Sequence, residues 1–276
     1  MPDAGCRTLA DTFNRLFAHR QMSVCKSTAH KLLRNQAYAV LHVRRSMGRK
    51  APYPAAPNDT WALDMTGRAD TSGIVHNILG IVDHGSRRSL FLRAITSKSS
   101  WQLLSWLCLT IDLYGKPRAI RTDNERCFTS SAFAWGLKLL GIRHQRIDKG
   151  CPWQNGRIER FFGTLKQCLK QVQFDNASAL DFLLTDFGCW YNLIRPHQSL
   201  GGLTPMEAWQ GMNAFDPSQP PPTVRFMKYW DGLLCGFLHA ALAATQSKQT
   251  TCQSVVRTAG RQSTPERQRT STQRLF

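Results

Sequence analysis

The stretch GCPWQNGRIERFFGTLK, residues 150 to 166, predicts a long amphipathic helix, and the layers of the fold follow from it. Over 153–172 the apolar side chains recur at helical spacing, at Ile158, Phe161, Phe162, Leu165, Leu169 and Val172. A helix with such a stripe needs an apolar partner, which in a mixed domain is the face of a sheet. An adjacent face carries Glu159, Gly163, Lys166 and Lys170, so one carboxylate lies among basic residues.

The residues before and after this helix are expected to form the strands of the sheet and the other helices that cover it. Apolar, strand-like runs occupy 60–65, 74–82, 90–95, 118–122 and 142–147, and helical patterns occupy 99–114, 131–140, 177–193 and 206–211. The helix over 99–114 is apolar nearly all round, which predicts that it is buried. Three strands followed by alternating helices and strands indicate an α/β domain with one mixed sheet covered on both faces.

The charge of the chain predicts a polyanionic partner. Its 276 residues include 36 Lys and Arg against 18 Asp and Glu, a net charge of +18. Nucleic acid is the first candidate and an anionic membrane surface the second. No apolar run is long enough to cross a bilayer, and the first residues lack a signal-peptide pattern. Nine scattered cysteines without a CxxC pair favour reduced thiols in a cytoplasmic protein and disfavour structural zinc.

Residues 1–43 are expected to form a helix-turn-helix. In the second helix Val24, Ala29, Leu32 and Leu33 can face inward, which leaves a polar, basic face of Lys26, Ser27, His30, Lys31 and Arg34 for DNA. The alternative is a helical hairpin with a solvated basic face.

The remaining boundaries follow from composition. The stretch RRSMGRKAPYPAAPN, residues 44–58, is expected to be an extended basic linker, with Arg44 and Arg45 along a phosphate backbone. Residues 59–212 would form the α/β domain. A C-terminal extension over 213–276 begins with a proline-rich joint and ends, after residue 243, in a Ser/Thr/Gln-rich basic tail that we expect to be disordered.

Three carboxylates occupy positions where α/β domains build their sites. Asp64 lies in the first strand, in WALDMTG, Asp123 ends the strand of AIRTDNE, and Glu159 lies in the first or second turn of the long helix. These positions converge at one edge of the sheet. Three converging carboxylates repel one another, and a divalent cation such as Mg²⁺ or Mn²⁺ relieves the repulsion while engaging phosphate oxygens. In a basic chain this predicts metal-assisted phosphoryl transfer.

The same residues resemble the DD(35)E signature of DDE transposases and retroviral integrases, with 35 residues between Asp123 and Glu159. Around them, WALDMTG, GIVDHGSR, IRTDNE, GIRHQRI, CPWQNGRIERFFGTLK and WYNLIRPHQSLGGLTPMEAW are similar to the integrase core of bacterial insertion-sequence transposases. The resemblance implies an RNase H-like fold with two Mg²⁺ or Mn²⁺ ions on Asp64, Asp123 and Glu159. It also implies a homo-oligomer on double-stranded DNA that cuts terminal inverted repeats and joins the 3′-OH to target DNA. A catalytically inactive remnant acting as a repressor, and a nuclease that only hydrolyses, stay open.

Several residues near the acids have both a functional and a structural interpretation. Arg157, Arg160, Lys166 and Lys170 would hold the DNA backbone, or else form an ion-pair lattice with Glu159 on a solvated face. Asn155 is either the N-cap of the long helix or a DNA contact.

Other residues near the acids have a structural interpretation first. Asp83 is expected to cap its own turn, and Glu125 is the main competitor for an acidic role. Trp101 and Trp106 are expected in the core or at a dimer face.

Overall fold

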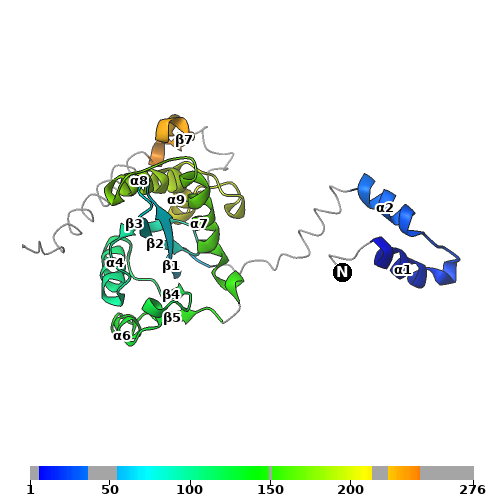
Figure 1. Ribbon diagram of the computed structural model, residues 1–276, viewed down its shortest axis with the longest axis horizontal. Coiled ribbons are helices and arrows are strands. Elements are labelled where there is room, and N and C mark those ends of the chain that lie inside the picture. The colour runs from blue at the N-terminus through cyan, green and yellow to red at the C-terminus, as the bar shows by residue number, and fades with distance from the viewer. Residues whose placement is uncertain (1–5, 37–54, 149–150, 213–222, 243–276) are drawn as a thin grey trace, which may run out of the picture. The chain divides into compact units, whose positions relative to one another are not determined.

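A computed structural model describes residues 6–36, 55–148, 151–212 and 223–242. It divides the chain into two compact units, with the boundary between Pro54 and Ala55 (Figure 1). No described helix is long and apolar enough to cross a membrane.

The first unit is a pair of short helices. Helix α1 (Cys6–Leu16) and helix α2 (Lys26–Asn35) are joined through a 3₁₀ turn at Ala18–Arg20. The Asn14 side chain fixes the connection, because its Oδ1 accepts from the Val24 backbone N–H at 2.7 Å and its Nδ2 donates to the Val24 carbonyl at 3.1 Å. The turn and the basic second helix therefore exist, and their use in binding DNA stays a prediction. Residues 37–54, which include Arg44 and Arg45, lie outside the described residues.

One residue of this unit, Leu32, was expected to face inward and does not. Ala29 is buried, but Leu32 is 57% exposed. Two short helices offer too little surface to cover every apolar position of α2.

The second unit is built on a five-stranded mixed sheet. Its strands are β1 (Thr60–Ala69), β2 (Val75–Asp83), β3 (Ser89–Ile95), β4 (Ala119–Thr122) and β5 (Arg143–Arg146), in the order β3-β2-β1-β4-β5. Strands β1, β2 and β3 are antiparallel neighbours, whereas β4 runs parallel to both β1 and β5. This is the mixed sheet flanked by helices expected of an RNase H-like domain.

Helices cover both faces of the sheet, as Figure 1 shows. Side chains alternate along β1, so Trp61 and Leu63 pack under α4 (Ser100–Tyr114), α5 (Arg126–Thr129) and α6 (Ser131–Leu139). Ala62 faces the other way, toward α7 (Gly156–Leu169) and α8 (Ala177–Leu193). Short helix α9 (Pro205–Gln210) follows α8 and begins with a capping box at Thr204. Asp64 shares the face of Ala62, which is the α7 side.

Helix α4 is less buried than its composition predicts. Leu103, Leu104 and Leu107 are buried against the sheet and α6, but Trp101 is 71% exposed. A helix lying on one face of a sheet has an outer side, and the apolar residues of α4 on that side remain at the surface. The core assignment of Trp101 is therefore wrong, whereas Trp106 packs against the core.

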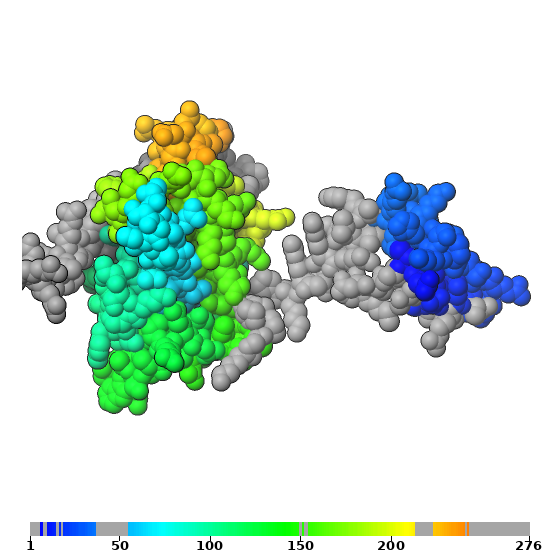
Figure 2. Space-filling model, in the orientation of Figure 1, coloured from blue at the N-terminus to red at the C-terminus, as the bar shows by residue number. Residues whose placement is uncertain are grey.

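A β-hairpin near the C-terminus was not identified from the sequence. Strands β6 (Val224–Tyr229) and β7 (Leu234–His239) pair antiparallel, and Trp190 of α8 donates from Nε1 to the Cys235 carbonyl at 3.2 Å. Leu234 and Leu238 are buried against α8 and its neighbours, and Figure 2 shows the hairpin seated over that part of the surface. Part of the expected extension is thus folded, while the tail after residue 243 lies outside the described residues.

The close packing of α7 on the sheet depends on a glycine. Gly80 of β2 pairs with Asp64 of β1, and a Cβ added at Gly80 would lie 2.7 Å from Phe162 Cζ. The Phe162 ring cannot swing away, because it is buried and packed against Phe161 with ring centroids 5.5 Å apart. Any side chain at position 80 would therefore push α7 away from β2, the strand that pairs with Asp64.

We predict opposite effects of alanine at two glycines. Gly80→Ala should lower the free energy of unfolding by about 1–3 kcal/mol, since the added methyl overpacks the core. Gly163→Ala is the control within α7, where a Cβ meets nothing within 4 Å. It should raise stability by about 0.5–1 kcal/mol, because alanine is the better helix residue. Urea unfolding of the two variants measures both, and equal stability of Gly80→Ala and the parent would contradict the packing argument.

Candidate active site

The strand register brings Asp64 and Asp123 together. In the parallel pair β1–β4, Trp61 lies opposite Ile120 and Ala62 opposite Arg121. Two more residues along each strand, Asp64 comes level with Asp123, which directly follows β4. Partners in a parallel ladder point to the same face, so both carboxylates are on the α7 side. Glu159 lies in the first turn of α7, above the same edge.

Mutual repulsion and burial are visible at Asp64. Burial is the largest cause that raises the pKa of the Asp64 carboxyl, and with the negative charges of Asp123, Glu125 and Glu159, in that order, it brings the pKa to about 7. A hydrogen bond of 2.7 Å from the Met65 backbone N–H to Oδ1 opposes the rise. Asp123 and Glu159 therefore act on Asp64, and within the described parts of the chain no Lys or Arg forms an ion pair with any of the three acids.

Glu159 is not part of an ion-pair lattice. Its side chain is exposed, and no Lys, Arg or His of the described segments comes within ion-pair distance of it. The structural alternative for this carboxylate thus has no support in the structure. An unpaired acid between basic neighbours is instead available to a cation that arrives from solution.

Glu125 is a genuine fourth carboxylate at this edge. It influences Asp64 more than Glu159 does, and its backbone N–H donates to Asp123 Oδ1 at 2.9 Å. Its side chain, however, already accepts a hydrogen bond from Lys98 at 3.1 Å. This partner distinguishes Glu125 from the other three acids.

A buried chain of polar groups fixes the start of α7. Arg157 turns inward and donates from Nη1 to the His84 carbonyl at 2.6 Å, with His84 Nδ1 at 3.3 Å. His84 is only 3% exposed, and burial, followed by the charge of Arg157, lowers its pKa to about 3. The imidazole is therefore neutral. Because a guanidinium can only donate, Nδ1 accepts and the proton is on Nε2, which has no partner within the described residues.

The turn that carries His84 is itself held from both ends. Asp83 accepts at Oδ1 from the Asn58 backbone N–H at 2.9 Å, and at Oδ2 from the Ser86 backbone N–H and hydroxyl, both at 2.7 Å. This is the turn-capping role expected of Asp83. The rigid turn gives Arg157 a fixed anchor two residues before Glu159.

Helix α7 is tied to the sheet on a second side. Arg121 of β4 donates from Nη1 to the Gln154 carbonyl at 3.2 Å, and the Gln154 side chain donates to Asp148 at 2.8 Å. Asn155 occupies the N-cap position without making a cap hydrogen bond, and it is 2% exposed. The start of α7 is therefore located by Arg121 and Arg157, and not by its N-cap side chain.

The predicted DNA-contacting residues of α7 divide into two groups. Arg160, Lys166 and Lys170 are exposed and can meet a phosphate backbone. Asn155 is buried and Arg157 bonds inward to His84, so the structure does not support a DNA-contact role for either side chain. The helical period alone cannot tell an inward arginine from an outward one.

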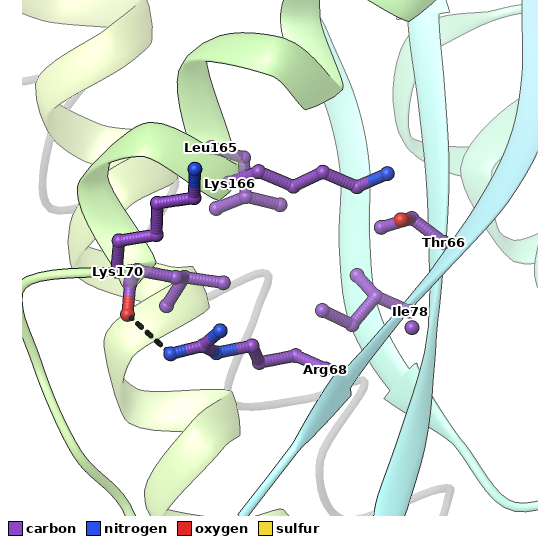
Figure 3. Close-up of a pocket in the computed structure, with 8 residues that line it drawn as sticks. Thr66, Arg68, Ile78, Leu165, Lys166 and Lys170 are labelled. Atoms are coloured by element: carbon purple, nitrogen blue, oxygen red, sulfur yellow. Dashed lines mark hydrogen bonds between the residues drawn. The ribbon is translucent and has the colours of Figure 1, made fainter.

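Lys166 and Lys170 line a cleft between α7 and β1 that includes Arg68, which was missed from the sequence (Figure 3). The signal was present in the chain, because Asp64, Thr66 and Arg68 alternate along one face of β1.

The carboxylates offer the hard oxygen ligands that Mg²⁺ and Mn²⁺ prefer. Their chemistry fits such an ion, and so does the lack of a basic side chain paired with Asp64, Asp123 or Glu159 among the described residues. Their placement is not that of a finished site, because no three His, Cys, Asp or Glu of the described residues are arranged to hold a metal ion.

Comparison with known protein families agrees with the geometry. Two family models, each described as an integrase core domain, match residues 54–152 and 140–205. Together they span residues 54–205, more than half of the chain, and include all three acids. The chain belongs to the superfamily of DDE transposases and integrases.

Relatives of this superfamily member come from bacterial insertion elements. It is 32% identical over 186 residues to a 39.2 kDa protein of insertion element IS476 from Xanthomonas euvesicatoria, a match that covers 64% of this chain and 54% of the relative. It is 26% identical over 157 residues to the transposase InsF for insertion sequence IS3A from Escherichia coli, covering 55% and 54% of the two chains. The chain thus spans about half the length of these relatives.

Solved structures of retroviral integrases are also similar. The catalytic core domain of HTLV-2 integrase, in complex with magnesium, shares 22% identity at a TM-score of 0.46, covering 56% of this chain and 98% of that one. A simian T-cell lymphotropic virus intasome shares 20% identity at a TM-score of 0.49, covering 82% and 86%.

The raised pKa of Asp64 predicts a pH-dependent stability effect. Between pH 3.8, near the ordinary pKa of an aspartate, and about pH 7, this carboxyl keeps its proton in the folded protein and loses it on unfolding. As pH rises through this window, the carboxyl therefore lowers the free energy of unfolding more and more. Without metal, Asp64→Asn should therefore raise the melting temperature by several degrees at pH 8 and by much less at pH 4.5. Thermal unfolding in EDTA at the two pH values checks this.

Asp70→Asn is the control with the opposite sign. A hydrogen bond from His76 at 2.8 Å, and then bonds from the Ile74 and Ser72 backbone N–H groups, lower the pKa of Asp70. The Asp70 carboxylate therefore stabilises the folded protein above pH 3.8, so Asp70→Asn should have a lower melting temperature at both pH values. A gain for Asp64→Asn that does not change with pH would show that charge is not the cause.

Proposed function

We propose that this protein is a DNA transposase that cleaves the ends of a mobile element and joins the resulting 3′-OH to target DNA. One observation supports this most directly. Asp64, Asp123 and Glu159 meet at one sheet edge without a basic partner among the described residues, in a chain with a net charge of +18. Neighbouring carboxylates, whose oxygens suit divalent cations, on a chain whose net charge attracts polyanions would suit phosphoryl transfer on a nucleic acid.

Asp64, Asp123 and Glu159 would hold two Mg²⁺ or Mn²⁺ ions. When bound, such ions stabilise the negative charge that develops on the oxygens of the reacting phosphate. Asp64, with its pKa near 7, is partly protonated at neutral pH in the absence of metal. It must release that proton to become a ligand, so metal affinity should rise with pH. Arg157 and Arg121 hold the backbone around Glu159 in place while ligands exchange.

Double-stranded DNA, as element ends and as target, is the proposed partner. Arg160, next to Glu159, and Lys166 and Lys170, farther along α7, would bind its phosphates. The basic face of the first unit, which consists of Lys26, Ser27, His30, Lys31 and Arg34, would select the terminal inverted repeats, with Arg44 and Arg45 adding phosphate contacts. Such a protein would work in the cytoplasm, on the nucleoid.

A homo-oligomer on DNA fits the outer surface of α4 and α6. Trp101, Trp135 and Leu139 are large apolar side chains exposed there. Apolar surface of this kind is typical of protein–protein contacts. The competing idea of a DNA-binding remnant without catalysis is not favoured, because it gives the unpaired acids no role.

Removing the charge of any one acid should abolish catalysis. Asp64→Asn, Asp123→Asn and Glu159→Gln keep the side-chain shape but remove a ligand charge, so cleavage and joining should each fall by at least about a thousandfold. The assay uses labelled element ends with Mg²⁺ or Mn²⁺ and a supercoiled target. DNA affinity in EDTA should hold or increase, since one anion facing phosphate is gone.

Glu125→Gln is the matched control for the third acid. Glu125 lies as near the site but is paired with Lys98, so its change should be mild. Loss of joining in Glu125→Gln equal to that in Glu159→Gln would contradict the choice of Glu159. Substantial joining by Glu159→Gln would overturn it.

Replacing Arg157 and replacing Arg160 should have different effects on cleavage and on DNA binding. Arg157→Ala frees the start of α7, so cleavage should fall at least tenfold while DNA affinity in EDTA stays within about twofold of the parent. Arg157→Lys should recover part of the rate, because its ammonium can still donate to the His84 carbonyl. Arg160→Ala, which removes an exposed cation, should weaken DNA binding instead. Weakened binding in Arg157→Ala, with a smaller salt dependence, would show that Arg157 contacts phosphate after all.

A further inference from the structure

Two hydrogen bonds in series reach the backbone of Asp123 from the face of the sheet opposite its carboxylate. The Thr122 hydroxyl donates to the Asp123 carbonyl at 2.9 Å, and His144 Nε2 lies 2.9 Å from the same hydroxyl oxygen. Side chains alternate along β4, so Thr122 points to the α6 side of the sheet. His144 lies on that side too, because its ring packs edge-on against Phe133 of α6, with ring centroids 5.5 Å apart. We call these two side chains the Thr122–His144 bridge.

The two bonds determine which atoms carry the protons. A hydroxyl has one proton and a carbonyl oxygen can only accept, so the Thr122 proton lies on the bond to Asp123. His144 Nε2 must therefore donate to the hydroxyl oxygen. Burial, and after it the charge of Arg146, lower the pKa of His144, so the ring is neutral at neutral pH and its one N–H proton is on Nε2. The bridge thus has one direction, from the imidazole through the hydroxyl to the carbonyl.

The backbone at Asp123 lies just beyond a strand, where the ladder of the sheet ends. Strand β4 ends at Thr122, whose carbonyl accepts from the Ile147 backbone N–H at 3.1 Å. On the other side of Asp123, Asn124 Nδ2 donates to the Ile147 carbonyl at 2.9 Å. Both neighbours of Asp123 are therefore tied to the end of β5, and the carbonyl of Asp123 itself is held by the bridge.

The carboxylate of Asp123 has one oxygen fixed and one left over. Oδ1 accepts from the Glu125 backbone N–H at 2.9 Å, which limits rotation of the side chain. Oδ2 makes no hydrogen bond or ion pair with any residue that the structure describes. With the carbonyl and Oδ1 both held, Oδ2 keeps one position before any cation arrives. A ligand atom that is already in place binds more tightly, because less freedom is lost on binding.

We propose that Thr122 and His144 are positioning residues for Asp123, which hold its backbone so that Oδ2 stays in place for the cation that the three acids would share. The inference rests on the proposed function, since that gives the acids their role. Both side chains act from the α6 side, so the sheet separates them from the carboxylates and from DNA bound there. Their effect on the cation can only pass through the backbone of Asp123.

Binding of Mn²⁺ alone to the full-length chain, followed by the electron paramagnetic resonance signal of the free ion, tests the bridge. Thr122→Val keeps the shape but removes the hydroxyl, so Mn²⁺ affinity should fall by about tenfold, as for other losses of a hydrogen bond behind a ligand. His144→Phe keeps a ring against Phe133 but removes the donor that orients the hydroxyl, so affinity should fall by about threefold. The double variant should be no weaker than Thr122→Val, because His144 acts only through that hydroxyl.

Two further variants separate the hydrogen bond from packing. Thr122→Ser loses the methyl group that valine keeps but retains the hydroxyl, so its Mn²⁺ affinity should stay within about twofold of the parent. Thr110→Val is the matched control, because Thr110 is 1% exposed and its hydroxyl donates to the Trp106 carbonyl at 2.7 Å, within α4. It should lower the melting temperature, as Thr122→Val does, without changing Mn²⁺ affinity.

Three results would overturn the proposal. They are parent-like Mn²⁺ affinity in Thr122→Val, an affinity of Thr122→Ser as low as that of Thr122→Val, and a double variant whose loss is the product of the two single losses. Should Thr122→Val not fold, His144→Phe is compared with His144→Gln, whose amide can still donate to the hydroxyl. Partial recovery of affinity in His144→Gln supports the bridge, and equal affinities of the two variants contradict it.

Failure of this proposal can be told from failure of the proposed function. A parent protein that binds Mn²⁺ and shows these losses, but neither cuts nor joins DNA, keeps the bridge and loses the proposed reaction. A parent that cuts and joins, while Thr122→Val binds Mn²⁺ as well as the parent does, keeps the reaction and loses the bridge. A parent without affinity for Mn²⁺ contradicts both the bridge and the metal role of the acids.

Discussion

The contact of Phe162 with Gly80 sets how closely α7 can lie over the sheet. Strand β2 carries Gly80 opposite Asp64, and the ring of Phe162 occupies the space that any larger side chain would take. Helix α7 can therefore lie low over the sheet, which places the carboxylate of its first turn near those of β1 and β4. A larger residue at Gly80 would lift the helix, and a rise of even 1 Å is enough to spoil catalytic geometry. The cleft at the far end of α7 depends on the same approach, since Arg68 spans it to Leu169.

The site is costly for the folded protein, and the cost is concentrated at Asp64. Burial and three neighbouring carboxylates act on it together, and among the described residues the Met65 hydrogen bond alone opposes them. Evolution toward stability alone would replace such a residue, so its presence favours a role that needs negative charge. The same reasoning applies to Arg68 Nε and His84 Nε2, two shielded donors without partners among the described residues. Asp64 and Arg68 lie on β1, and His84 holds Arg157 at the start of α7.

Periodicity predicted the layers of this protein but not its contacts. The strands, helix α7 and the sheet edge near the three acids could be predicted from residue spacing and strand ends, because these are local properties of the chain. The core interpretation of Trp101 was wrong, and the dimer-face interpretation stays a prediction, since composition cannot tell which side of an apolar helix meets the sheet. The hairpin β6–β7 was missed because a proline-rich stretch and a polar tail flank two short strands. Glu125 was rightly singled out as a competitor, yet its pairing with Lys98 depends on a contact across 27 residues that no local pattern contains.

The basic residues of α7 show why net charge is a guide to partners and not to contacts. Arg157, Arg160 and Lys166 lie in one stretch, and charge alone would send all three to the DNA backbone. Arg157 instead donates a hydrogen bond to the His84 carbonyl, where burial makes a charged hydrogen bond stronger than it would be at the surface. The neutral imidazole beside it is maintained by the same burial that lowers its pKa to about 3. Arg157 thus fixes the start of α7 while Arg160 stays exposed, so the inward charge that positions Glu159 and the outward charge proposed to bind DNA come from different faces of the same turn.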